Sequence, residues 1–186
     1  MLNLKEIINI LKNDGVGVIP TDTLYGLVGS SFSKKAVNRI YKIKKRNKNS
    51  KLINLIHSIK DLEKFNIQIN TEQAKFLKKI WPGKVSVIIN NISFRIPNKK
   101  SLLEILKKTG PLVAPSANPE GLNPAENIEQ AKVYFGPARN AFSLADAGGD
   151  KVDFYLSGGT LKSEASTLVS LDKKGEITIL RGILKK

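Results

Sequence analysis

The feature that most constrains the fold is an alternation of short apolar runs with amphipathic segments along the 186-residue chain. Apolar positions at helical spacing follow Asn3 and stop at Asn13-Asp14-Gly15, and the apolar run over 16–20 then predicts a buried strand. Ser33 precedes a second helical pattern, and the run over 52–56 predicts the next strand. This strand, helix, strand order is typical of α/β domains.

The second half of the chain adds strands in hairpins. Asn90-Asn91 joins two apolar runs, over 85–89 and 92–96, and therefore predicts a hairpin turn. The other expected elements are a helix from Thr71 to near Trp81-Pro82-Gly83, a helix capped by Ser101 with Glu104 and ended by Gly110, a strand over 112–114, a helix capped by Asn127 with Gln130 and ended by Gly136, and strands over 166–171 and 176–180. Strands in both hairpins and crossovers predict an α/β fold with a mixed, twisted β-sheet and helices packed on it.

The composition fits one globular domain, which we expect to span residues 1–186. Apolar residues make up 41% of the chain, enough for one sizeable core. The chain has no Cys and no apolar run near the roughly 18 residues of a membrane span. Met1 leads into an amphipathic pattern and not into a signal peptide. We therefore expect a cytoplasmic protein with no disulfide and no membrane association.

The chain is strongly basic, with 31 Lys and Arg against 16 Asp and Glu and a formal net charge of +15. Such an excess favours anionic partners, namely nucleotides or RNA. Lys is used throughout the chain, however, so a merely solvated basic surface explains the charge as well. The charge leaves both interpretations open.

Several kinds of chemistry are excluded by residues that the sequence lacks. Without Cys there is no thiolate nucleophile and no cysteine zinc cluster, and His57 is the single His for any catalytic triad. His57 follows an apolar strand, where a partly buried surface residue is the better interpretation. No Walker motif is present, and Gly15-Val16-Gly17 precedes a strand where a dinucleotide fingerprint would follow one. A site of hydroxyls, amides and cations at strand ends remains.

Five polar segments at the ends of expected elements could build such a site. The segment 20–27 could hold an amino acid through its hydroxyls and amides, or it could cap a turn. Lys44-Lys45-Arg46 could bind phosphates or complement a helix dipole. Ser116-Ala117-Asn118 could hold a ligand or form a turn, and Ser166-Thr167 and Arg181-Gly182 are ordinary when taken alone.

In this order, the segments resemble the YrdC-like family of threonylcarbamoyl-AMP synthases in its short, single-domain form. The resemblance runs from about residue 16 to 182. It is carried by Pro20 to Leu27, Lys44 with Arg46, Trp81-Pro82-Gly83, Phe94-Arg95-Ile96-Pro97, Ser116 to Asn118, Ser166 to Leu168, and Ile179 to Arg181. The chain departs from the family pattern at Lys45, Asn47 and Lys51, at Glu120, and in the short connection between Ile89 and Ile92.

The resemblance implies a YrdC-like fold with a concave basic cleft and a nucleotidyltransferase activity. The enzyme would join L-threonine, bicarbonate and ATP into threonylcarbamoyl-adenylate and pyrophosphate, the first step of threonylcarbamoyladenosine formation in tRNA. It also implies threonine ligands at Thr21, Arg95 and Ser166, and nucleotide ligands at Lys44, Arg46, Ser116, Asn118 and Arg181, with Lys44 and Arg46 as the catalytic pair. Acidic residues are scarce in these motifs, so Mg²⁺ would be carried in with ATP and no metal site would be formed by the protein.

The expected product would pass to a separate threonylcarbamoyl transferase. Only residues 182–186 follow the last motif, and we expect no second domain to cover the cleft. Two alternatives remain open. An RNA-binding module would explain the charge, although the chain lacks the aromatic-rich strands of an RRM and the G-x-x-G clamp of a KH domain. A carbamoyltransferase domain of hydrogenase maturation proteins shares the fold and would use carbamoyl phosphate.

Overall fold

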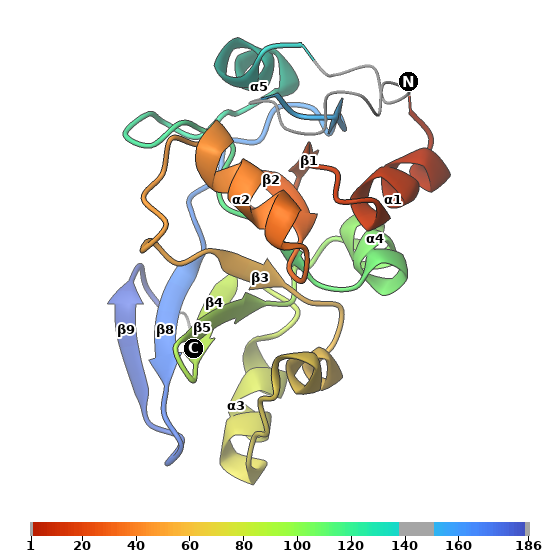
Figure 1. The fold of residues 1–186 in the computed structure, drawn as a ribbon. Coiled ribbons are helices and arrows are strands. Elements are labelled where there is room, and N and C mark those ends of the chain that lie inside the picture. Colours follow the sequence, from red (N-terminus) through yellow and green to blue (C-terminus); the bar gives the residue numbers. More distant parts are fainter. Residues whose placement is uncertain (1, 138–150, 185–186) are drawn as a thin grey trace.

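The computed structural model describes residues 2–137 and 151–184, which form a continuous sheet flanked by helices (Figure 1). The helices are α1 (Leu4–Lys12), α2 (Lys34–Ile43), the 3₁₀ helix η1 (Ile59–Phe65), α3 (Thr71–Ile80), α4 (Lys100–Thr109) and α5 (Ile128–Phe135). The strands are β1 (Gly17–Pro20), β2 (Tyr25–Ser30), β3 (Ile53–Leu55), β4 (Val85–Ile89), β5 (Ile92–Arg95), β6 (Leu112–Val113), β7 (Phe154–Tyr155), β8 (Thr167–Leu171) and β9 (Ile177–Arg181).

The nine strands form one mixed sheet in the order β7-β1-β2-β6-β3-β5-β4-β8-β9. The pairs β1–β7, β3–β5 and β4–β8 are parallel, and the other pairs are antiparallel. The predicted mixed α/β fold is therefore confirmed. Figure 1 shows β1 and β2 beside α2 in one half of the molecule, and β4, β5, β8 and β9 beside α3 in the other.

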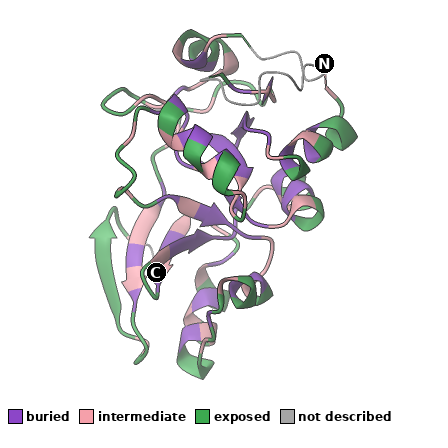
Figure 2. Cartoon of the chain, in the orientation of Figure 1, coloured by how far each residue is buried: buried purple, intermediate pink, exposed green. Residues whose placement is uncertain are grey.

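Three apolar clusters hold the helices to this sheet, and the purple strands of Figure 2 run through them. α2 packs closely on β2 because position 29 has no side chain: a Cβ on Gly29 would lie 3.0 Å from the Cβ of Ala36. α1 and α4 share a second cluster, and α3 contributes Leu77 to the third, beside Val87 and Val169. One face of β4, β5 and β8 is thus covered by α3, and the other face is left for the site.

Short polar side chains begin most of the helices, and the predicted caps at Ser33 and Asn127 are among them. Asn3, Ser33, Asn70 and Asn127 each accept a hydrogen bond from the backbone N–H three residues later. The predicted cap of α4 by Ser101 with Glu104 is wrong. That helix begins at Lys100, so residue 101 is already helical, and its N-cap is Lys99, which makes no side-chain capping bond.

The hairpin predicted at Asn90-Asn91 is confirmed. Ile89 pairs with Ile92, and the two asparagines have φ values of 46° and 68°, the left-handed region that two-residue hairpin turns require. The sequence reasoning missed η1, β7 and β2. No strand is predicted over β2, whose sequence, Tyr-Gly-Leu-Val-Gly-Ser, contains two glycines, and glycine is unfavourable in strands.

Candidate functional site

The predicted site residues lie around a cavity of about 400 Å³ on the face of the sheet opposite α3. Its floor contains Ile53, Ser93, Ile88 and Leu168, which lie on four neighbouring strands. The alternate position Phe94 points to the α3 side, because successive residues of a strand face opposite ways. Six predicted residues, each from a different segment of the chain, also line the cavity: Thr21, Arg46, Arg95, Ser116, Ser166 and Arg181.

Arg95, the last residue of β5, is a buried cation in this cavity, with only 5% of its surface exposed. Its Nη1 lies 3.0 Å from Oδ1 of Asp22, yet neither atom makes an aligned hydrogen bond, and Nε of Arg95 has no partner among the described residues. Burial lowers the pKa of Arg95, and the charge of Asp22 opposes that shift. The result is a charged guanidinium with free donors, suited to a small carboxylate.

Thr21 occupies the turn between β1 and β2, and its hydroxyl is engaged within that turn. Its Oγ1 donates to the carbonyl of Leu24 at 2.7 Å and accepts from the backbone N–H groups of Thr23 and Leu24 at 3.0 and 3.2 Å. The hydroxyls of Thr21 and Thr23 lie 3.0 Å apart. The turn-capping interpretation therefore describes these bonds, while the residue itself remains in the cavity wall.

Lys44 and Asn118 lie behind the cavity wall and contact each other. Lys44 is 2% exposed, and its Nζ donates to the carbonyls of Ser116 and Asn118, both at 2.5 Å. Burial, aided by the positive charge of Arg46 and opposed by Glu120, lowers the pKa of Lys44 from 10.5 to about 8. Lys44 thus positions the loop that carries Ser116, and neither Lys44 nor Asn118 is in the cavity lining.

Arg46 reaches the cavity from the loop after α2. Lys45, the residue after the C-cap of α2, has φ of 51°, a conformation that favours glycine, and it turns the chain toward Arg46. The backbone N–H of Arg46 donates to the carbonyl of Tyr41 at 2.9 Å, which fixes the loop to the helix. Its Nε lies 4.0 Å from Oε1 of Glu120, a half-exposed carboxylate.

Ser166, the residue before β8, and Arg181, the last residue of β9, also line the cavity. Arg181 donates from Nη2 to the carbonyl of Ser166 at 2.9 Å, so the two predicted residues are directly joined. The hydroxyl of Ser166 lies 2.8 Å from that of Ser86, which is fully buried. Ser86 was missed by sequence reasoning, although a serine inside the apolar strand Val-Ser-Val-Ile-Ile is a signal that could have found it.

Ser93 adds a free hydroxyl to the site, whereas His57 lies outside its lining. Ser93, also missed, lines the cavity with a buried hydroxyl that has no partner among the described residues. His57 is absent from the residues that line the cavity, and its backbone N–H donates to Asp61 at 2.9 Å. Within residues 2–137 and 151–184 no three acidic or histidine side chains form a metal-binding group. In the same ranges, every helix is too short or too polar to span a bilayer.

Comparisons with known proteins identify relatives of this chain and similar folds. The family model Sua5_yciO_yrdC, described as "Telomere recombination", matches residues 9–182. A threonylcarbamoyl-AMP synthase of Cellvibrio japonicus is 27% identical over 155 residues, 75% of this chain and 82% of that protein. The fold is similar to that of P. abyssi Sua5 complexed with L-threonine (TM-score 0.78, 22% identity, 96% of this chain and 53% of that one) and of E. coli YciO (TM-score 0.76, 19% identity, 96% and 87%). Because the family model covers nearly the whole chain, the protein belongs to the Sua5/YciO/YrdC family.

Proposed function

We propose that this protein is a threonylcarbamoyl-AMP synthase of the nucleotidyltransferase class. The observation that carries the proposal is Arg95, a buried guanidinium with free donors that lines the same cavity as the more exposed Arg46 and Arg181. A single small carboxylate would pair with Arg95, and a polyphosphate would pair with the rim cations. Relatives named threonylcarbamoyl-AMP synthase and the Sua5 complexed with L-threonine support this choice of ligands.

The reaction needs no protein nucleophile, which fits a cavity without Cys, His or a carboxylate among its described lining residues. The amino group of L-threonine attacks the carbon of bicarbonate, and water leaves to give N-carboxythreonine. A carbamate oxygen then attacks the α-phosphorus of ATP, the bond from that phosphorus to the bridging oxygen breaks, and pyrophosphate leaves. The protein holds the reactants together and stabilises the charge that develops on the phosphates.

Threonine would be held by Thr21, Ser93, Arg95 and Ser166, which all line the cavity. Arg95 would take the α-carboxylate, and the free hydroxyl of Ser93 would bond to the side-chain hydroxyl of threonine. A methyl group would pack against the apolar floor, which includes Ile88 and Ile53. Together these contacts would select an amino acid that carries both a hydroxyl and a methyl group.

The phosphates of the nucleotide would be contacted by Arg46, Ser116 and Arg181, which also line the cavity. Lys44 and Asn118 would act one step away, by fixing the backbone of the loop that carries Ser116. Mg²⁺ would be bound through phosphate oxygens of ATP, because none of the described residues in the lining is a carboxylate. It would screen the charge of the triphosphate during displacement.

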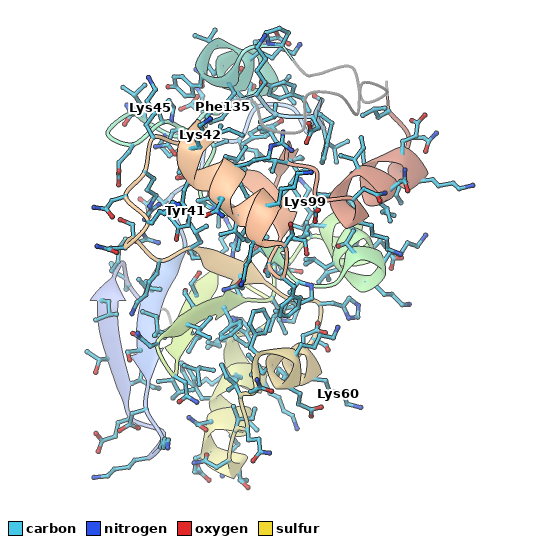
Figure 3. The ribbon with its side chains drawn as sticks, in the orientation of Figure 1. Tyr41, Lys42, Lys45, Lys60, Lys99 and Phe135 are labelled. Atoms are coloured by element: carbon cyan, nitrogen blue, oxygen red, sulfur yellow. The ribbon has the colours of Figure 1, made fainter. Side chains whose placement is uncertain are left out.

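The product would leave for a separate threonylcarbamoyl transferase that modifies tRNA, and the reaction would take place in the cytoplasm. Weak RNA binding by the basic surface would be a consequence of charge. Figure 3 labels Lys45, Lys60 and Lys99 in separate parts of the view, on the loop after α2, on η1 and before α4. A dispersed charge of this kind favours weak, sequence-independent contact over a dedicated RNA site.

The test is pyrophosphate release with each substrate omitted in turn. Release should require L-threonine, bicarbonate, ATP and Mg²⁺ together, because the carbamate formed from the first two is the nucleophile. Equal release without threonine would reject the proposal. Turnover of carbamoyl phosphate in place of threonine and bicarbonate would instead favour the carbamoyltransferase alternative.

A further inference from the structure

Lys51 lines the same cavity but belongs to none of the motifs that carry the family resemblance. It lies between the loop after α2 and the start of β3, and its surface is exposed. It also stands at a position where the chain departs from the family pattern. The family resemblance therefore implies no role for Lys51.

The backbone on both sides of Lys51 is fixed. Tyr41, labelled on α2 in Figure 3, donates from its hydroxyl to the carbonyl of Ser50 at 2.9 Å. On the other side, Leu52 is 8% exposed and belongs to the core, and Ile53 begins β3. Because both neighbours are anchored, the side chain of Lys51 is directed at the cavity from a defined point.

The Nζ of Lys51 donates to Oδ1 of Asn91, in the hairpin turn between β4 and β5. That partner is neutral and leaves the charge of the ammonium uncompensated. No carboxylate among the described residues pairs with Lys51, whereas Arg46 on the same loop has Glu120 at 4.0 Å. An anion in the cavity would be a stronger partner than Asn91, because it would accept the same hydrogen bond and would also compensate the charge of the ammonium.

We propose that Lys51 binds the phosphate chain of the nucleotide and makes the site selective for a triphosphate over a monophosphate. The inference rests on the proposed function, because that function puts a nucleotide in this cavity. An ammonium on a flexible stem can exchange Asn91 for phosphate oxygens as the ligand enters. Lys51 and Arg46 would then hold the phosphate chain from the same loop.

The test is calorimetric titration of ATP, pyrophosphate and AMP, each with Mg²⁺, into wild-type protein and Lys51→Ala. The variant should bind ATP and pyrophosphate about tenfold more weakly, about 1.4 kcal/mol, and AMP with unchanged affinity. Lys51→Arg should restore most of the loss. Lys48→Ala is the matched control, because Lys48 is an exposed lysine of the same loop that does not line the cavity, and it should leave all three affinities unchanged.

The variant Asn91→Gly distinguishes phosphate binding by Lys51 from a purely structural role. It removes the acceptor of the Lys51 hydrogen bond, while glycine keeps the turn at φ of 68°. This variant should bind ATP at least as tightly as wild type. Equal weakening by Asn91→Gly and Lys51→Ala would overturn the proposal, as would unchanged ATP affinity in Lys51→Ala. Absence of ATP binding by wild-type protein would instead reject the proposed function itself.

Discussion

The burial of Lys44 predicts an unusual dependence of stability on pH. Its ammonium is 2% exposed and is held by two carbonyl oxygens. Its pKa falls from an ordinary value of 10.5 to about 8, chiefly because burial disfavours the charged form. In the window between these two values, the unfolded chain binds more protons at this group than the folded chain. Stability contributed by this group must therefore rise with pH through that window.

The magnitude follows from the difference of the two pKa values. At 1.36 kcal/mol per unit, burial of the charged form costs about 3 kcal/mol below pH 8, and this cost disappears as pH approaches 10.5. Between about pH 7.5 and about pH 9.5, linkage gives a change of about 2 kcal/mol. This is an upper value, because the carbonyls of Ser116 and Asn118 favour the ammonium.

The assay is urea unfolding of wild-type protein and Lys44→Met at both pH values. Methionine keeps the length of the stem without a titrating group, so other titrations cancel in the difference. Wild type should gain up to about 2 kcal/mol over Lys44→Met between the two pH values. The difference in free energy of unfolding between wild type and Lys48→Met, a variant at an exposed lysine, should not change between the two pH values. A wild-type advantage that stays flat or falls with pH would refute the reasoning.

Three further predictions concern the Arg39–Asp153 ion pair, Arg46 and the basic surface. Arg39→Met should lower the free energy of unfolding by about 3–5 kcal/mol, because it leaves Asp153 without the partner now 2.8 Å away; in denaturant unfolding an equally large loss for the exposed Lys132→Met would contradict this. Arg46→Ala should lower kcat about 100- to 1000-fold. Arg46→Lys should also lower kcat, because the point charge of an ammonium does not replace the paired donors of a guanidinium. Near-wild-type kcat for both variants would support the alternative that Arg46 only complements the dipole of α2. RNA binding, measured by filter retention, should be weak and fall steeply with salt, and tight, salt-independent binding would support the RNA-module alternative.

Much of the fold could be predicted because its signals are local. The Asn caps of α1 and α5 and the Asn90-Asn91 turn lie within a few residues of the elements that they define. β2 and β7 could not be predicted in this way. The glycines of β2 are tolerated because α2 packs against Gly29, and the two residues of β7 are held in parallel register beside β1, a contact between distant parts of the chain.

The site shows the same division between local and long-range information. Motif order identified six residues of the cavity wall, but not what each side chain contacts. The burial of Lys44 behind the loop of Ser116 depends on a packing contact across 72 residues of sequence. The approach of Asp22 to Arg95 and the exposed position of Lys51 beside the cavity also appear only when the segments fold together.

The central claim is that threonine, bicarbonate and ATP become one molecule in this cavity. The most direct measurement supplies labelled bicarbonate, labelled threonine and ATP to the purified protein, and separates the products after rapid quenching. The account predicts one adenylate that contains both labels in equal amounts, together with one pyrophosphate for each adenylate. An adenylate that carries the threonine label but no carbon from bicarbonate, or pyrophosphate without any adenylate, would contradict it.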